Sequence, residues 1–451
     1  MKVRNMTEGS PLKLLLYVAF PLMIGNVFQQ MYTVIDAQVL GRAEGYETLA
    51  ALGTCDWLNW LFFGLIQGLT MGFAIPIAQA FGANDEKTLK KAVGNSVIWG
   101  LIISVALAVV ALTCVNPILT LLKIEPELRP IATSYVRVLF AALPVVMAYN
   151  LLAGVLRSMG DGKTPLYAMA IASIINIALD YLFVMGFHLG VVGAAVATII
   201  AQVASCIFCF IKLKGFSMVR PEKADFRLEA DMSKKLISLG VPVAAQNMII
   251  AIGGMIILRV VNPMGAAFMA GYTSSTKLYG ILEIAAVSFG YAVSAYAGQN
   301  FGAGKRERIW KGVHVGAVMG VITALVIAAC MFLFGKPIIQ SFISGDDLEA
   351  VEKSARIGCE FLYIMSGALP ILYLLYVYRA ALQGMGNTLM PMLSGLAECV
   401  MRTLAALLLP SLIGYSGVFW AEALAWFGAD VILIPSYYIA MRRMKSDLKS
   451  K

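Results

Sequence analysis

Two aspartates in the first half of the sequence lie within stretches that are otherwise apolar. Asp36 follows Tyr32 by four residues, and Asp180 follows Asn176 by four residues, a spacing that places Asn176 and Asp180 on one face of a helix. Asn150, in an earlier apolar stretch, adds another amide. Carboxylate and amide oxygens suit a small hard cation, and a carboxylate removed from water also tends to bind a proton. The sequence therefore predicts a site for a cation or a proton.

A second set of side chains could bind an organic cation, because aromatic faces, Met sulfur and carboxylates attract such ligands. The candidates for such a surface are Gln29, Tyr32, Met71, Tyr272, Tyr279 and Glu283. Packing alone is the alternative role for a Met or Tyr in an apolar helix. Catalytic chemistry is not indicated, since the nucleotide fingerprint GxxxxGKS or GxxxxGKT is absent and His188 and His314 have no metal-ligand spacing.

The composition indicates that membrane-spanning helices carry these residues. Hydrophobic residues make up 60% of the chain and charged residues 14%, and the mean hydropathy is +0.80. The apolar runs can cross about 30 Å of hydrocarbon, and they are continuous where the strands of a barrel would alternate. We therefore predict an all-α integral membrane protein of about twelve transmembrane helices. The predicted spans are 14–40, 50–80, 93–122, 131–156, 165–187, 190–213, 236–261, 268–300, 312–335, 357–382, 389–413 and 417–441.

The formal net charge of +9 is distributed unevenly along the chain. Basic residues gather in alternate loops, for example at 87–91 and 305–311, whereas the intervening loops hold few. The longest of these intervening loops is acidic, with Asp346, Asp347, Glu349 and Glu352. The positive-inside rule then predicts a multi-pass protein of the cell membrane with both termini in the cytoplasm. The same placement argues against a nucleic-acid partner.

The sequence also contains an internal duplication. Residues 77–83, IAQAFGA, recur as AGQNFGA at 297–303, and residues 156–161, LRSMGD, recur as LQGMGN at 382–387. Six predicted spans separate each pair, so the halves point the same way and we expect a pseudo-two-fold axis along the membrane normal. The predicted organisation is an N-terminal six-helix lobe at 1–213, a cytoplasmic linker at 214–235 and a C-terminal six-helix lobe at 236–451.

The duplication allows an internal comparison of the acids. Aligned on their shared prolines, the halves set Asp36 opposite Ile257 and Asp180 opposite Ala406. A structural role would be expected in both halves, so the asymmetry favours a cation site in the first half alone. The alternative is that both aspartates lie at helix ends among the lipid headgroups, and the proximity of Arg42 to Asp36 keeps that alternative open.

Taken together, these features resemble the multidrug and toxic compound extrusion (MATE) family from about residue 10 to 440. The resemblance is carried by Pro21, Tyr32, Asp36 and Gly41-Arg42, by the duplicated Gln-Ala-Phe-Gly-Ala and Gln-Asn-Phe-Gly-Ala segments, and by residues 157–165. The family pattern implies a cation-coupling site, with Na⁺ as a candidate metal, at Asp36, Asn150, Asn176 and Asp180.

The resemblance further implies secondary active export of amphipathic, often cationic compounds, driven by inward flow of Na⁺ or H⁺ through rocker-switch alternating access. Small-molecule substrates and membrane lipid are the partners expected, with no cofactor besides the coupling ion, and a monomer is the simplest assembly. One departure is that some branches carry an acid in helix 7, where this chain has Gln246 and Asn247.

Two alternatives remain at this stage. A flippase for lipid-linked oligosaccharides or peptidoglycan precursors would keep the architecture, but it would need a basic cavity, and the membrane cations Lys277, Arg379 and Arg402 all lie in the second half. Arg402 is also four residues after Glu398, so we predict that these two side chains pair. A membrane-embedded enzyme or a channel is the other alternative, and no catalytic constellation supports it.

Overall fold

The computed structural model describes residues 4–121, 127–342 and 348–449, nearly all of them helical. A few residues named in the predictions lie outside the described residues. They are Met1 and Lys451 at the ends of the two predicted lobes, Asp346 and Asp347 of the acidic loop, and the last residue of the predicted span 93–122. Within the described part, eleven helices are long and apolar enough to span a membrane, and one bent pair of helices makes a twelfth. The prediction of about twelve transmembrane helices is confirmed.

Most predicted spans lie inside helices that extend further at one or both ends. The helices of the first half are α1 Pro11–Glu44, α2 Tyr46–Gly82, α3 Glu86–Leu121, α4 Arg129–Ala141, α5 Leu143–Ser158, α6 Lys163–Asp180 and α7 Gly190–Lys214. Those of the second half are α8 Ala230–Val261, α9 Ala266–Gly302, α10 Arg306–Phe342, α11 Leu348–Gly384, α12 Leu389–Ile413 and α13 Ser416–Lys449.

Two predicted spans are not single α-helices. The span expected at 131–156 consists of α4 and α5, which are bent by 47° at Ala142. Pro144 is near the start of α5 and has no N–H to donate, so a continuous helix would lack a hydrogen bond at this point. The span expected at 165–187 ends as a π-helical segment, Tyr181–Gly186, directly after Asp180.

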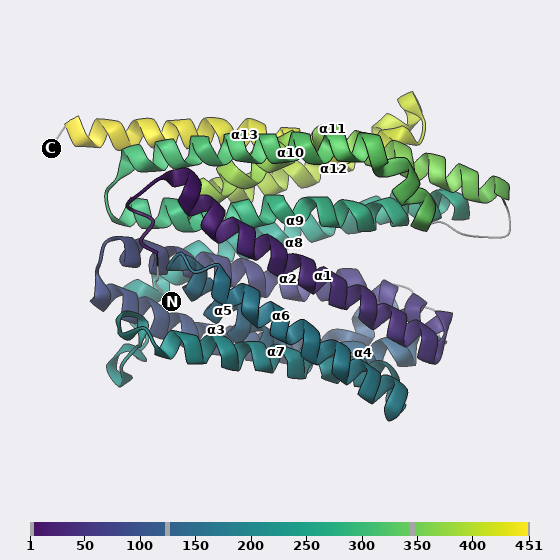
Figure 1. The fold of residues 1–451 in the computed structure, drawn as a ribbon, viewed down its shortest axis with the longest axis horizontal. Helices are drawn as coiled ribbons and strands as arrows, with labels where there is room; N and C mark the ends of the chain where they lie inside the picture. Colours follow the sequence, from purple (N-terminus) through teal and green to yellow (C-terminus); the bar gives the residue numbers. More distant parts are fainter. Residues whose placement is uncertain (1–3, 122–126, 343–347, 450–451) are drawn as a thin grey trace. The chain divides into compact units, whose positions relative to one another are not determined.

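The chain divides into two compact units. The N-terminal unit contains Phe20–Ala244 and residues up to Asn5, and the C-terminal unit contains Met6–Ala19 and the residues from Ala245 onward. In the N-terminal unit, α6 and α7 lie side by side (Figure 1). A core of buried apolar side chains from α2, α3 and α5 fills the unit, with the first half of α8 against α2.

The duplicated motifs form similar helix ends in the two units. The backbone N–H of Ala83 after α2 donates to the Gln79 carbonyl at 3.0 Å, and that of Ala303 after α9 donates to the Gln299 carbonyl at 2.9 Å. Each motif closes the last turn of its helix and leads into the next one. The sequence repeat therefore corresponds to a repeated local structure.

Candidate functional site

The start of α6 is fixed by Asp161 of the second duplicated motif. Asp161 Oδ1 accepts hydrogen bonds from the backbone N–H groups of Lys163 and Thr164, both at 3.0 Å, and Oδ2 accepts one from the Thr164 hydroxyl at 2.5 Å. These bonds satisfy N–H groups that the first helical turn leaves without partners. They fix where α6 begins, and so which face of the helix carries Asn176 and Asp180.

Asp180 is fully buried at the end of α6. Neither of its carboxylate oxygens receives a hydrogen bond from any residue that the structure describes, and the same holds for Oδ1 of half-buried Asp36 on α1. The two carboxyl groups nevertheless lie close enough to interact with each other. Two acids therefore face one another without a donor from the described side chains.

The surroundings of this acid pair are apolar. Val39 and Leu40 follow Asp36 by three and four residues, and Val184 follows Asp180 by four. These three side chains pack in one buried apolar cluster with Val191 and Ala194 of α7. Burial among apolar side chains makes two unpaired carboxylates costly, because mutual repulsion is added to the loss of hydration. A proton or a small cation bound at the pair would remove that cost.

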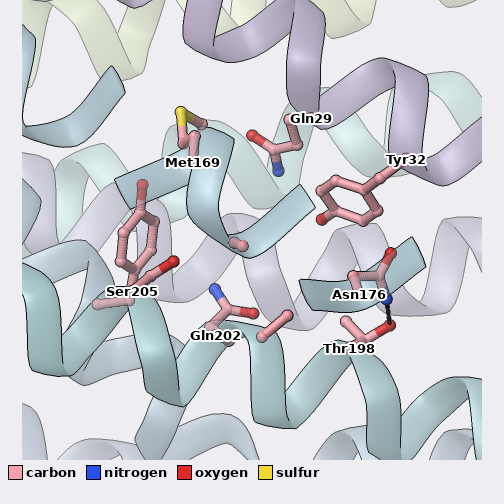
Figure 2. Close-up of a pocket in the computed structure, with 10 residues that line it drawn as sticks. Gln29, Tyr32, Met169, Asn176, Thr198, Gln202 and Ser205 are labelled. Carbon is pink, nitrogen blue, oxygen red and sulfur yellow. Dashed lines mark hydrogen bonds between the residues drawn. The ribbon is translucent and has the colours of Figure 1, made fainter. Parts of the chain in front are cut away.

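A cavity in the N-terminal unit is lined by residues that lie one helical turn from the two acids. Figure 2 shows Gln29 and Tyr32 of α1 on one side and Gln202 of α7 opposite them, with Asn176 at one end. The complete lining is Gln29, Tyr32, Tyr149, Met169, Ala172, Asn176, Thr198, Ala201, Gln202 and Ser205. Tyr32 and Asn176 precede Asp36 and Asp180 by one helical turn, so the cavity leads toward the acid pair.

Polar atoms with unused hydrogen-bonding capacity face this region. Asn176 donates to the Thr198 hydroxyl at 3.4 Å, whereas its Oδ1 has no partner among the described groups. The hydroxyl of Tyr149 is likewise buried, with no described partner. Such atoms are expected where water or a ligand completes the bonding.

The structure brings most of the predicted first-half residues together. Gln29, Tyr32 and Asn176 line the cavity, and Asp36 and Asp180 lie one helical turn beyond Tyr32 and Asn176. Asn150 and Met71 are not among the lining residues. The amide of Asn150 on α5 donates to the Val146 carbonyl of its own helix at 2.9 Å, and Met71 is a half-buried residue of α2.

The other predicted substrate-binding residues belong to the C-terminal unit. Tyr272 is 8% exposed and stacks on Phe268 and Phe419 with ring-centroid distances of 6.3 and 6.5 Å, so it packs within an aromatic cluster. The Tyr279 ring stacks on Trp426 at 5.8 Å. The carboxylate of Glu283 accepts a hydrogen bond from the Tyr376 hydroxyl at 2.6 Å.

A chain of buried ion pairs links three helices of the C-terminal unit. Arg379 on α11 binds Glu398 on α12 at 2.8 Å, Arg402 binds Glu398 at 3.0 Å, and Arg402 also binds Glu422 on α13 at 2.8 Å. The predicted pairing of Glu398 with Arg402 is confirmed. Gln246 of α8, where some branches of the family carry an acid, also contacts Arg379. When the Gln246 amide is oriented so that both groups are satisfied, its oxygen accepts a hydrogen bond from the Arg379 Nε at 2.8 Å.

Residues of α7 were missed in the interpretation of the sequence. Thr198, Gln202 and Ser205 line the cavity at a spacing of four and three residues. This spacing puts them on one face of a helix that is otherwise apolar. The periodicity of polar residues would have identified that face, whereas a search for charged residues does not.

A comparison with known proteins identifies the family. The MatE family model matches residues 21–182 and 242–408, well over half of the chain and both of its halves. The chain belongs to the MatE family. It is therefore a multi-pass membrane transporter of a family that contains transporters and not enzymes. The matches begin at Pro21 and Pro242, in agreement with the duplication.

Several curated proteins are similar over most of their length. This MatE chain is 28% identical over 372 residues to the probable multidrug resistance protein YpnP of Bacillus subtilis, which covers 81% of the chain and 82% of that protein. It is 25% identical to the probable multidrug resistance protein NorM of Thermotoga maritima, covering 84% and 82%. It is 24% identical to the multidrug export protein MepA of Staphylococcus aureus, covering 94% of each.

Solved structures show that the MatE chain has the fold of this family. A MOP superfamily transporter from Pyrococcus furiosus superposes with a TM-score of 0.92 at 22% identity, covering 99% of each chain. A multidrug resistance MATE family transporter of the MOP superfamily, solved in an outward-facing conformation, gives a TM-score of 0.91 at 22% identity, again covering 99% of each.

Proposed function

We propose that this MatE chain is a secondary active multidrug exporter that couples inward movement of Na⁺ or H⁺ to efflux of amphipathic, often cationic compounds. The names of the curated relatives, which describe multidrug resistance and export, support this cargo. Both termini are proposed to lie in the cytoplasm, and the predicted lobes 1–213 and 236–451 are proposed to rock against each other about the linker 214–235. One chain is the proposed transporting unit.

The observation that carries the proposal is the facing pair of Asp36 and Asp180 beside the cavity. Two ionised carboxylates in an apolar environment repel each other, and a bound cation or proton relieves the repulsion. A substrate cation that approaches the same acids would compete for the same negative charge. Mutual exclusion of the coupling ion and the cargo at one charged site is sufficient for antiport, if each state of the transporter releases one and admits the other.

Dye efflux from proteoliposomes tests this proposal. Efflux is measured with an imposed Na⁺ gradient, with an imposed proton gradient, and with neither. Under whichever gradient drives the wild-type protein, Asp36→Asn and Asp180→Asn should each reduce gradient-driven efflux at least tenfold. Normal efflux by both variants would contradict the proposed role of the pair.

Asp85→Asn is the matched control for these variants. Asp85 precedes α3 outside the apolar spans, and Asn serves as well as Asp at the start of a helix. The control should transport at the wild-type rate under both gradients. A comparable loss in the control would show that the effect is not specific to the acid pair.

The flippase alternative receives little support from the charges in the C-terminal unit. A diphosphate cargo would require cationic side chains available for binding. Arg379 and Arg402 are instead paired with Glu398 and Glu422. Both membrane arginines are thus neutralised by acids of their own unit, so Lys277 alone remains of the three membrane cations named in the sequence analysis, which favours the exporter.

A further inference from the structure

A buried acid of the C-terminal unit has no part in the mechanism proposed above. Asp430 is only 6% exposed, and its Oδ1 has no hydrogen-bond partner among the described residues. It is the fifteenth residue of α13, which begins at Ser416, so it lies about 21 Å along the helix axis from that end. Since α13 is long enough to cross a membrane, Asp430 is near its middle, and a buried charge there requires compensation.

The charged and titratable groups around Asp430 come from the helices that pack against α13. Arg379 and Tyr378 of α11 and Glu398 of α12 are close enough to interact electrostatically with Asp430. From α10, His314 reaches α13 two turns further along, where its Nε2 is 3.4 Å from the hydroxyl of Tyr438. Arg379 is therefore the single cation among these neighbours that is near enough to neutralise Asp430.

Arg379 is already engaged with other partners. Its Nη2 donates to Glu398 Oε2 at 2.8 Å. With the Gln246 amide oriented so that both groups are satisfied, the Nε and Nη1 of Arg379 donate to the Gln246 oxygen at 2.8 and 3.2 Å. Within the chain of ion pairs, two arginines face the two carboxylates of Glu398 and Glu422, so their charges balance. An ionised Asp430 would add a net negative charge to a cluster that is neutral without it.

A proton fits this excess charge better than a metal ion does. A small metal cation needs several oxygen ligands, and no group of three or more acidic, His or Cys side chains suited to a metal occurs in the described part of the chain. The guanidinium of Arg379 next to Asp430 would also repel a metal cation. A proton needs a single oxygen and removes the charge completely.

We propose that Asp430 is a proton-binding site, located in the C-terminal unit and separate from the pair of Asp36 and Asp180. A proton from water adds to the Asp430 carboxylate to give the neutral acid, and its release restores the anion. The ionised form attracts Arg379 and competes with Glu398 for it, so proton release weakens the ion pair between α11 and α12. Asp430 lies beyond residue 408, where the second family match ends.

Infrared difference spectroscopy of the purified full-length protein tests the proposal directly, because a protonated carboxyl group has its own carbonyl stretching band. The spectra are recorded as a function of pH in the Asp36→Asn/Asp180→Asn double variant, which removes the first acid pair. A titrating carboxyl band should remain in this background and disappear when Asp430→Asn is added. A band that persists unchanged after Asp430→Asn would overturn the proposal.

Two further variants assign the band. Glu283→Gln removes another half-buried acid of the unit that is outside the ion-pair chain, and it should leave the band in place; loss of the band in this variant alone would overturn the proposal. Asp430→Glu retains a carboxyl group if Asp430→Asn does not fold, and it should shift the position of the band. An unshifted band in Asp430→Glu would also overturn it. Transport is not required in any of these measurements, so the result is independent of the proposed exporter function.

Discussion

Arg402 and Glu398 lie one turn apart on α12 and form an ion pair, with 3.0 Å between Nη2 and Oε1. Both side chains are buried, and each has a second partner of opposite charge on a neighbouring helix. In a membrane protein such a chain of pairs joins α11, α12 and α13 without leaving a net charge in the apolar interior. Its integrity should therefore matter more to stability than that of an ion pair on the surface.

We expect Arg402→Leu to destabilise the C-terminal unit by about 3–5 kcal/mol, because Glu422 would lose its cation and Glu398 would keep only Arg379. The measurement is thermal or denaturant unfolding in detergent. Adding Glu422→Leu restores the charge balance and should recover part of the loss. Arg259→Leu, at an exposed position on α8, is the control and should change stability little. Equal effects of Arg402→Leu and Arg259→Leu would contradict the importance of burial.

The close approach of α2 to α8 in the N-terminal unit gives a second prediction. A Cβ added to Gly72 would lie 2.4 Å from the Cα of Gly240, too close for any side chain. Gly72→Ala should therefore force the helices apart and cost about 1–3 kcal/mol. Gly53, on the same helix, has no described atom within 4 Å of an added Cβ, so Gly53→Ala should be neutral or stabilising by up to about 1 kcal/mol. The melting temperature in detergent should fall for Gly72→Ala and should stay level or rise for Gly53→Ala. Equal melting temperatures of the two variants would contradict the close contact between α2 and α8.

The number and positions of the helices could be predicted because long apolar runs have few structural alternatives in a membrane. The break at Ala142 was not predicted, although Pro144 was visible. A proline in a membrane helix is often accommodated without a break, as Pro21 and Pro76 are in α1 and α2. Whether Pro144 bends or divides the span depends on packing around it, which the sequence does not display.

The charged residues of the candidate site could be predicted from the sequence. Asp36 and Asp180 stood out because acids are rare in apolar spans, and the structure places them together. Asn150 was expected beside them and stays a prediction: its Nδ2 donates to the Val146 carbonyl of its own helix, and it is not among the residues that line the cavity. Thr198 was missed, since a single hydroxyl in an apolar helix normally bonds to its own backbone. Which neutral polar side chains join a site depends on helix rotation, which a local sequence pattern does not specify.

A pH-dependent prediction concerns Asp85 at the start of α3. Hydrogen bonds from the Thr88 hydroxyl at 2.6 Å and the Thr88 backbone N–H at 3.0 Å lower the pKa of Asp85 below its ordinary value. A lowered pKa means that the stabilisation is present above the ordinary Asp value of about 3.9 and is lost as the pH falls through the lowered value. Amides in the first turn of α3 should lose hydrogen-exchange protection in that acidic range. Asp85→Asn caps the helix without titrating, so the hydrogen-exchange protection factors of this variant should not change with pH. Equal losses of protection in the variant and the wild-type protein would contradict the role of the Asp85 carboxylate.

The hydroxyl of Thr198 provides the last prediction, which depends on the proposed coupling function. It accepts a hydrogen bond from the Asn176 amide at 3.4 Å and donates to the Ala194 carbonyl at 3.1 Å, so it holds Asn176 one turn from Asp180. Thr198→Val keeps the shape but removes this partner, at a cost of about 1 kcal/mol.

If Asn176 contributes to cation binding, the Na⁺ or H⁺ concentration for half-maximal efflux by Thr198→Val should rise about fivefold, while the maximal rate changes less. Thr198→Ser retains the hydroxyl and should behave like the wild-type protein. An unchanged half-maximal concentration in Thr198→Val, with an intact efflux rate, would show that the bond between Asn176 and Thr198 supports packing alone. A similar rise in Thr198→Ser, which keeps the hydroxyl, would show that the acceptor for the Asn176 amide does not set the half-maximal concentration.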